Sequence, residues 1–224
     1  APGWPGIESV AVAFSGGLDS TVLLAALARL DLPVPVRALH IDHGLHSDSA
    51  RWLEHCQRVA EELGVGFASH EVTVQTDGAQ SPEAAARDAR YRALGEMLAG
   101  RELLLTAHHR DDQLETILLR LVRGTGVRGL RAIEPASERH GMSLVRPLLD
   151  FSRDELRAIA EVWKLRWIED PSNADSRFDR NYLRNEVIPP LKARWPGMTT
   201  TAARAAEKMR AAQEILDDVA HHAE

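Results

Sequence analysis

One short polar loop restricts the fold of this chain more than any other feature, and its residues are Ser15, Gly16, Gly17, Leu18, Asp19 and Ser20. An apolar run typical of a buried strand precedes it at residues 10–14, and an apolar segment typical of a packed helix follows at residues 21–27. A helix start presents unpaired N–H groups and partial positive charge, and paired glycines let the backbone approach phosphate oxygens closely. The loop therefore predicts a phosphate-binding site.

Two common phosphate-binding motifs do not match this loop. A Walker A loop ends in Gly-Lys-Ser or Gly-Lys-Thr, and no lysine stands here. The dinucleotide fingerprint needs three spaced glycines, whereas Gly16 and Gly17 are adjacent. The alternative without a ligand is a turn between strand and helix that Asp19 caps, since aspartate favours helix starts.

Apolar runs alternate with helical segments along the chain, as in doubly wound folds. Strands are predicted at residues 10–14, 36–41, 66–74, 103–107 and 144–149. Helices are predicted at residues 21–27, 47–63, 81–99, 108–119, 152–164, 178–194 and 199–222. The predicted fold is α/β, with a doubly wound, mainly parallel five-stranded sheet, helices on both faces and a small helical extension.

The predicted domain boundaries follow the change from alternating strands to helices alone. Residues 1–150 form the nucleotide-binding domain, and residues 151–198 form a helical part with a polar turn and a basic helix. Residues 199–224 are predicted to start a helical linker or C-terminal domain, because their helix meets no glycine or proline stop signal. We therefore expect the natural protein to continue.

Composition narrows the class of protein. No apolar stretch approaches the roughly 18–20 residues that span a bilayer, and the N-terminus lacks signal-peptide features, so we expect a cytoplasmic protein without membrane contact. The single cysteine, Cys56, excludes an internal disulfide, and its predicted helix favours a packing role. A net charge of −6 argues against general nucleic-acid binding but leaves local basic patches open.

Polar residues lie at the ends of two predicted strands, where ligands of parallel sheets bind. His40 and Asp42 end the second strand and are predicted to border a nucleotide. A denser cluster follows the fourth strand and comprises His108, His109, Asp111, Asp112, Glu115 and Thr116. On a helix that starts there, spacings of four and three residues put His108, Asp112 and Glu115 on one face.

Three roles fit this cluster. Asp111, Asp112 and Glu115 could hold Mg²⁺ with nucleotide phosphates, the same carboxylates could receive a cationic substrate, or they could only favour a helix start. A zinc site is disfavoured, because no cysteine completes four ligands.

Basic residues gather in three places. Arg87 and Arg90 share a predicted helix face with Glu83 and Tyr91, where a surface ion pair between Glu83 and Arg87 needs no function. The other two groups could contact phosphate or simply form solvated helix faces. They consist of Arg120, Arg123, Arg128 and Arg131, and of Arg177, Arg180, Arg184, Lys192 and Arg194.

Taken together, these motifs resemble the tRNA(Ile)-lysidine synthetase family of PP-loop ATP pyrophosphatases, whose loop has the pattern S-G-G-x-D-S. The resemblance covers almost the whole chain. Beyond the loop it rests on residues 40–45, 83–87 with 90–91, 107–116, 123–126 with 129–130, 146–149, 167–173, and 179–181 with 184. The block AHHRDDQLET, the loop RGTG and the turn WIEDPSN are the most selective of these.

The resemblance implies a two-step ligation. The C2 oxygen of the wobble cytidine in the CAU anticodon of tRNA(Ile) attacks the α-phosphorus of ATP, which releases pyrophosphate. The ε-amine of lysine then displaces AMP. The implied cofactors are ATP and Mg²⁺, the implied partners are that tRNA and L-lysine, and the sequence leaves a homodimer open.

The resemblance also implies roles for single residues. Residues 15–20 would bind the phosphates of ATP, with Asp19 as a catalytic residue and Mg²⁺ ligand, while His40 and Asp42 would border the nucleoside. Arg87, Arg90 and His108 would assist adenylation. Asp112, with Asp111 or Glu115, would receive lysine or metal. Contacts with tRNA would come from Arg123, Arg128, Arg180 and Arg184, and the last two could instead contact the reacting phosphate.

Two alternatives remain at this stage. Another PP-loop enzyme, such as a tRNA thiolase or an amide-forming synthetase, would fit the loop, although a thiolase typically needs more cysteines than Cys56 alone. A non-catalytic nucleotide-binding module would need no acidic cluster after the fourth strand. Fold analogy does not separate these, so the site residues decide.

Overall fold

The computed structural model describes residues 6–42, 48–72 and 82–222, which form two compact units. The first unit draws on the ranges Ala1–Ala107, Pro135–Pro147 and Asp154–Glu169. The second draws on His108–Glu134, Leu148–Arg153 and Asp170–Glu224. The predicted helix starts at Ser47 and Ser81 lie outside the described residues, and the predicted boundaries at 150 and 198 stay a prediction. None of the described helices combines the length and apolarity needed to cross a membrane.

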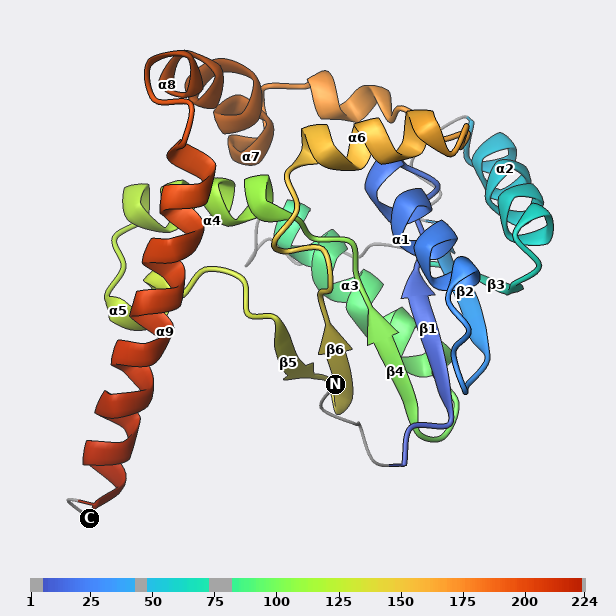
Figure 1. The fold of residues 1–224 in the computed structure, drawn as a ribbon, viewed down its shortest axis with the longest axis horizontal. Coiled ribbons are helices and arrows are strands. Elements are labelled where there is room, and N and C mark those ends of the chain that lie inside the picture. Colours follow the sequence, from blue (N-terminus) through green and yellow to red (C-terminus); the bar gives the residue numbers. More distant parts are fainter. Residues whose placement is uncertain (1–5, 43–47, 73–81, 223–224) are drawn as a thin grey trace. The chain divides into compact units, whose positions relative to one another are not determined.

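The first unit is built on a six-stranded sheet with the order β3-β2-β1-β4-β6-β5 (Figure 1). The strands are β1 (Ser9–Ala13), β2 (Val36–Asp42), β3 (Gly66–Glu71), β4 (Glu102–Leu105), β5 (Ala136–Arg139) and β6 (Met142–Val145). Neighbouring strands run parallel, except that β5 pairs antiparallel with β6. The predicted α/β class is confirmed, but the predicted count of five strands is one too low. The sequence pattern does not reveal β5, because Ala-Ser-Glu-Arg contains no apolar run.

Helices cover both faces of this sheet. In Figure 1, α1 (Leu18–Arg29) lies in front of the sheet, and α3 (Pro82–Met97), drawn fainter, lies behind it. Tyr91 and Leu94 of α3 pack on the strand residues Ala11, Leu39 and Leu104, and all five side chains are buried. This apolar layer holds β1, β2 and β4 in place, and so it also positions the polar residues that follow these strands.

The strand order reverses beside β1. The chain runs from β1 to β2 and β3 on one side, and then crosses to β4 on the other side of β1. In open parallel sheets, such a reversal leaves a crevice outside the carboxyl ends of the strands, and ligands bind there. The residues between β1 and α1 follow β1 at this reversal point, so the polar loop stands where the fold favours a ligand.

The second unit is helical. Its elements are α4 (Arg110–Val122), α5 (Val127–Leu130), a 3₁₀ turn (Pro171–Ala174), α7 (Asp179–Tyr182), a π-helical turn (Leu183–Val187), α8 (Ile188–Arg194) and α9 (Met198–His222). Its core joins Leu114 of α4 to Leu183 and Ile188. The core therefore fixes α4, the π-helical turn and α8 against one another.

Most predicted helices agree with the structure within a few residues. The predicted segments at 47–63, 152–164 and 199–222 correspond to α2 (Ser49–Glu62), α6 (Arg153–Val162) and α9. The predicted glycine-rich loop after Arg123 contains the single turn α5. The helix predicted over 178–194 is interrupted by the π-helical turn. Pro189 and Pro190 lie in the first turn of α8, where a missing N–H is tolerated.

Candidate active site

The polar loop connects β1 to α1 in the conformation that its glycines permit. Gly16 has φ +78°, and Gly17 stands at the N-cap of α1, where it has no side chain to cap the helix itself. The hydroxyls of Ser15 and Ser20 lie 3.1 Å apart, and Thr21 Oγ1 donates to the Gly17 carbonyl at 2.9 Å. The loop therefore gathers hydroxyls and helix-start N–H groups at one turn, which suits an anion.

Cys56 of α2 packs directly beneath this loop. A Cβ atom added at Gly16 would lie 2.6 Å from Cys56 Sγ, closer than any side chain tolerates. Cys56 is buried, and burial raises the pKa of its thiol to about 12, so the thiol stays protonated at neutral pH. Cys56 is therefore a packing residue, as the sequence predicts.

His40 ties the end of β2 to the end of β1. Its Nδ1 donates to the Phe14 carbonyl at 2.9 Å, and its ring stacks on Phe67 with centroids 6.4 Å apart. Burial lowers the pKa of His40, against the opposing effects of the Phe14 hydrogen bond and Asp42. A neutral, buried His40 therefore supports the strand ends, while Asp42 ends β2 in a half-buried position.

The arginines predicted to assist adenylation lie on α3. The Arg87 guanidinium lies over the Tyr91 ring, 5.8 Å from its centroid, and Arg139 approaches the same ring at 4.3 Å. Arg90 is exposed. The side chain of Glu83, the predicted partner of Arg87, lies outside the described part of the chain. The catalytic role of Arg87 and Arg90 stays a prediction.

The acidic cluster lies at the start of α4 in the second unit. The predicted helix start at His108 is two residues too early, because His109 is extended and α4 begins at Arg110. Asp112 Oδ2 instead accepts the backbone N–H of His109 at 2.9 Å, which caps the helix. His108 therefore stands before α4 and not on the same helix as Asp112.

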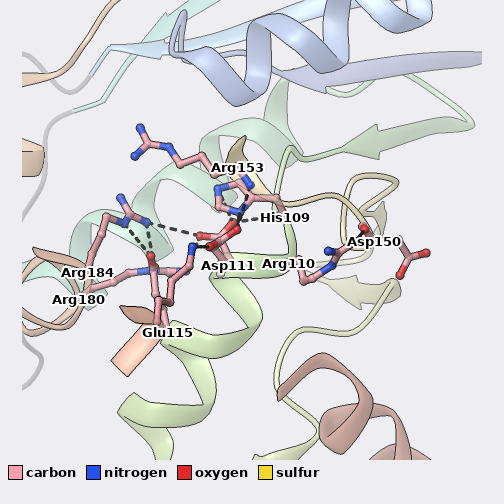
Figure 2. A network of polar contacts seen from close by, with 10 residues as sticks. His109, Arg110, Asp111, Glu115, Asp150, Arg153, Arg180 and Arg184 are labelled. Atoms are coloured by element: carbon pink, nitrogen blue, oxygen red, sulfur yellow. Dashed lines mark hydrogen bonds and ion pairs between the residues drawn. The ribbon is translucent and has the colours of Figure 1, made fainter. Parts of the chain in front are cut away.

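Two arginines hold the carboxylates of Asp112 and Glu115. Figure 2 shows both arginines, Arg180 and Arg184, beside Glu115. Glu115 Oε2 accepts from Arg180 Nε at 2.7 Å and from Arg184 Nη2 at 2.9 Å, while Oε1 accepts from Arg184 Nε at 2.6 Å. Arg180 Nη2 also donates to Asp112 Oδ1 at 2.9 Å. The Glu115 side chain is only 2% exposed, so these are charge-assisted bonds with little access to water.

Asp111 has a different set of partners. Its Oδ1 accepts from Lys192 Nζ at 3.0 Å, and its Oδ2 accepts the backbone N–H of Arg153 at 2.9 Å. In Figure 2 Asp111 and Arg153 lie beside His109, whose ring is 3.9 Å from Asp111 and 3.6 Å from Asp112. The cluster is thus a closed network of opposite charges.

This network does not fit a magnesium ion on Asp111, Asp112 and Glu115. Each carboxylate is already neutralised by an arginine or a lysine of the same unit. Within residues 6–42, 48–72 and 82–222, no group of three or more histidine, cysteine, aspartate or glutamate side chains is arranged to hold a metal. We therefore assign no metal to these carboxylates.

Comparison with known proteins identifies the family. A family model described as a PP-loop domain matches residues 5–191. The chain belongs to the PP-loop domain family. A PP-loop ATP-binding domain implies the use of ATP. The resemblance seen in the sequence motifs is confirmed.

Curated proteins similar to this PP-loop domain include tRNA(Ile)-lysidine synthases from several bacteria. The tRNA(Ile)-lysidine synthase of Pseudomonas fluorescens (strain Pf0-1) is 51% identical over 221 residues, which cover 97% of this chain and 49% of that protein. The protein of the same name from Coxiella burnetii is 46% identical over 212 residues, which cover 93% of this chain and 47% of the relative. The chain spans about half the length of the curated relatives it matches.

Solved structures support the fold of this PP-loop domain. The U34-tRNA thiolase NcsA from Methanococcus maripaludis has a TM-score of 0.72 at 18% identity and covers 90% of this chain and 71% of that one. NMN synthetase from Francisella tularensis has a TM-score of 0.52 at 9% identity, with coverages of 92% and 87%. At these identities the likeness concerns the fold alone.

The arginines predicted to contact tRNA fall into two groups in the PP-loop domain. Arg123 pairs with Asp179 at 2.6 Å, and Arg128 pairs with Asp217 at 3.2 Å, with all four side chains more than half exposed. Arg180 and Arg184 belong to the buried network instead. The exposed pairs are readily broken by a competing phosphate, whereas the buried arginines primarily hold Glu115.

Sequence reasoning did not identify two pairings in the network. Lys192 was expected only as part of a basic group, yet it neutralises Asp111 from 81 residues away. Glu115 and Arg184 are separated by 69 residues. Contacts between residues so far apart leave no local pattern in the sequence. The sequence indicates only that Arg180 and Arg184, four residues apart, could lie on the same face of a helix.

Acid is expected to destabilise the second unit through Asp111 and Asp112. Burial alone would raise the pKa of both carboxyl groups. For Asp112, the positive charges of His109, Arg180 and His108 lower the pKa by more than burial raises it. For Asp111, the Arg153 N–H and Lys192 have the same net effect. Both folded pKa values therefore lie below the unfolded value of about 3.9, and the ionised forms stabilise the fold. This stabilisation is present above about pH 4 and is lost as the pH falls through the folded pKa values.

The measurement is the free energy of unfolding in urea at several pH values from about 5 to 2. Asp112→Asn should flatten the acid slope, whereas Asp179→Asn, at an exposed position, should leave it unchanged. An unchanged slope in Asp112→Asn would exclude the proposed contribution.

Proposed function

We propose that this chain is the ATP-using part of a tRNA(Ile)-lysidine synthase, which joins lysine to C2 of the wobble cytidine in the CAU anticodon of tRNA(Ile). The observation that carries the proposal is the 51% identity over 97% of the chain to a protein of that name. The reaction forms an adenylated tRNA and pyrophosphate, and then the lysidine product and AMP.

The polar loop would bind the phosphates of ATP. The helix start after Gly17 supplies N–H groups, and Ser15 and Ser20 supply hydroxyls. In the first step the C2 oxygen forms a bond to the α-phosphorus while the bond to pyrophosphate breaks, so negative charge grows on the leaving group. Preorganised N–H donors stabilise such charge without rearranging during the reaction. Asp19 remains the proposed Mg²⁺ ligand, and Mg²⁺ would neutralise phosphate charge when bound.

Asp112 would recognise the ammonium group of lysine once Arg180, which occupies its Oδ1 in the structure, is drawn away toward tRNA, while Glu115 would stay paired with Arg184. In the second step the ammonium group first releases a proton to become an amine. Its nitrogen then bonds to C2 while the bond from C2 to the oxygen of AMP breaks, and the nitrogen releases a second proton to solvent. The lowered pKa of Asp112 makes this carboxylate a weak base, which favours an orienting role over proton removal. Arg180 is one of the charges that lower the pKa of Asp112, and the proposed contact of Arg180 and Arg184 with tRNA would require part of this network to rearrange.

The buried thiol of Cys56 supports lysine ligation over sulfur transfer. A thiolase needs reactive cysteines, whereas the one cysteine of this sequence is buried with a raised pKa. A non-catalytic nucleotide-binding module would use the acidic network after β4 for stability alone. These alternatives become outcomes of the assay below.

The test is chromatographic measurement of AMP and pyrophosphate from ATP, using the full reading frame that contains this chain. We expect AMP only when lysine and tRNA(Ile) with a CAU anticodon are present together, whereas tRNA without lysine should release pyrophosphate only up to the amount of adenylated tRNA formed. Asp112→Asn should lower turnover by about 100-fold while ATP affinity changes less than about 2-fold. Glu207→Gln, an exposed change on α9, is the matched control and should behave like the wild type.

AMP formation that does not depend on lysine, or does not depend on the tRNA, would reject lysine ligation and favour another adenylating enzyme. ATP binding without AMP under all conditions would favour a binding module. Normal turnover in Asp112→Asn would remove that residue from the mechanism and leave the overall function standing.

A further inference from the structure

The segment that follows α6 returns to the polar loop within the first unit. The backbone N–H of Ile168 donates to the Gly16 carbonyl at 2.9 Å. A Cβ atom added at Gly16 would lie 3.7 Å from Ile168 Cδ1, and one at Gly17 would lie 3.9 Å from the Ile168 carbonyl oxygen. Ile168 thus hydrogen-bonds to Gly16 through its backbone and borders the space beside both glycines.

The hydrogen bond from Ile168 controls the direction of one peptide plane. The Gly16 carbonyl and the Gly17 N–H belong to the same trans peptide, and so they point in opposite directions. A peptide between two glycines turns over more readily than others, because neither residue has a Cβ atom to restrict its dihedral angles. With the Gly16 carbonyl anchored on Ile168, the Gly17 N–H is directed to the opposite side.

That opposite side carries the hydroxyls of the loop. The Gly17 N–H points toward Ser15 Oγ at 3.3 Å, a long hydrogen bond that a phosphate oxygen can replace. If the peptide turned over, its carbonyl oxygen would face the phosphate and repel it. The orientation held by Ile168 is therefore the one that favours an anion.

We propose that Ile168 is a positioning residue for the polar loop, and that its backbone N–H holds the Gly16–Gly17 peptide with the Gly17 N–H directed at a phosphate of ATP. The proposal rests on the proposed function of the loop as an ATP site. It predicts that Ile168 contributes to binding of the phosphate chain and not to binding of the nucleoside.

The test replaces the Ile168 amide with an ester, by incorporation of the α-hydroxy acid analogue of isoleucine. This change removes the N–H donor and keeps the side chain. We expect the Kd for ATP to rise about 3- to 10-fold, as for loss of one hydrogen bond, while the Kd for adenosine stays within about 2-fold. A general loss of structure would move both constants together, so their ratio isolates the phosphate effect.

Two variants serve as controls. An ester at Leu165 removes another donor of the same segment, which bonds the Ala160 carbonyl at 2.9 Å away from the loop, and it should leave the ATP-to-adenosine ratio unchanged. Ile168→Ala keeps the N–H donor and should retain most of the ATP preference.

The outcomes separate the two proposals. A wild-type chain that binds ATP no better than adenosine would overturn the ATP site and, with it, the role of Ile168. A wild type that prefers ATP, with an unchanged preference in the Ile168 ester, would overturn the positioning role alone. Equal losses in the Ile168 and Leu165 esters would also overturn it, because the effect would then be general.

Discussion

Glu115→Ala is expected to lower the free energy of unfolding by about 3 kcal/mol, the low end of the range for breaking a buried ion pair. Glu115 accepts three hydrogen bonds from Arg180 and Arg184, and those guanidinium groups are only 20% and 26% exposed. Without Glu115, two positive charges would share Asp112 in a largely dry site. The cost comes mainly from these stranded cations and not from the lost attraction itself.

Urea unfolding followed by circular dichroism measures this effect. Asp179→Ala breaks the exposed pair with Arg123 and is the matched control, for which the loss should stay below about 1 kcal/mol. Glu115→Gln should fall between the two, because the amide oxygen still accepts a hydrogen bond but carries no charge. Equal losses in Glu115→Ala and Asp179→Ala would show that the network adds nothing to stability.

Gly16→Ala is expected to reduce ATP binding by at least about 10-fold and to destabilise the first unit. An alanine at φ +78° costs about 1–2 kcal/mol, and its Cβ atom would lie 2.6 Å from Cys56 Sγ. Relief of both strains requires the loop to move away from Cys56. Such a movement would displace the N–H groups that are proposed to bind phosphate.

Gly64→Ala is the matched control for this change. Gly64 has a similar φ of +68°, and an added Cβ there meets no described atom within 4 Å. It should lose about 1 kcal/mol of stability and no ATP affinity. The double variant Gly16→Ala with Cys56→Ala should recover part of the ATP affinity, measured by titration calorimetry. Full affinity in Gly16→Ala alone would contradict the close packing of the loop on Cys56.

The parts of the fold that follow from local patterns were predictable. Apolar runs predicted β1, β2 and β4 because these strands are buried in a parallel sheet. The edge strand β5 has half-exposed polar residues and no such run, so its pairing with β6 depends on tertiary context. The helix start at His108 was misplaced because Asp112 caps the helix from inside, which favours a start at Arg110.

The candidate site also has parts that the sequence predicts and parts that depend on tertiary contacts. The loop from Ser15 to Ser20 was predictable because its chemistry lies in six consecutive residues. The acidic cluster was predicted as a group of residues, but its partners were not, since Lys192 reaches Asp111 through the fold. The anchoring of Gly16 by a backbone N–H depends on no particular side chain and leaves no trace in residue types.

The burial of Cys56 gives this chain a practical use in spectroscopy. Its thiol is protonated and inaccessible, so maleimide reagents should not react with it under native conditions. A cysteine introduced at an exposed position such as Glu207 would then be the one reactive thiol. A single fluorophore attached there would test whether tRNA binds to the helical unit, without background from the native cysteine.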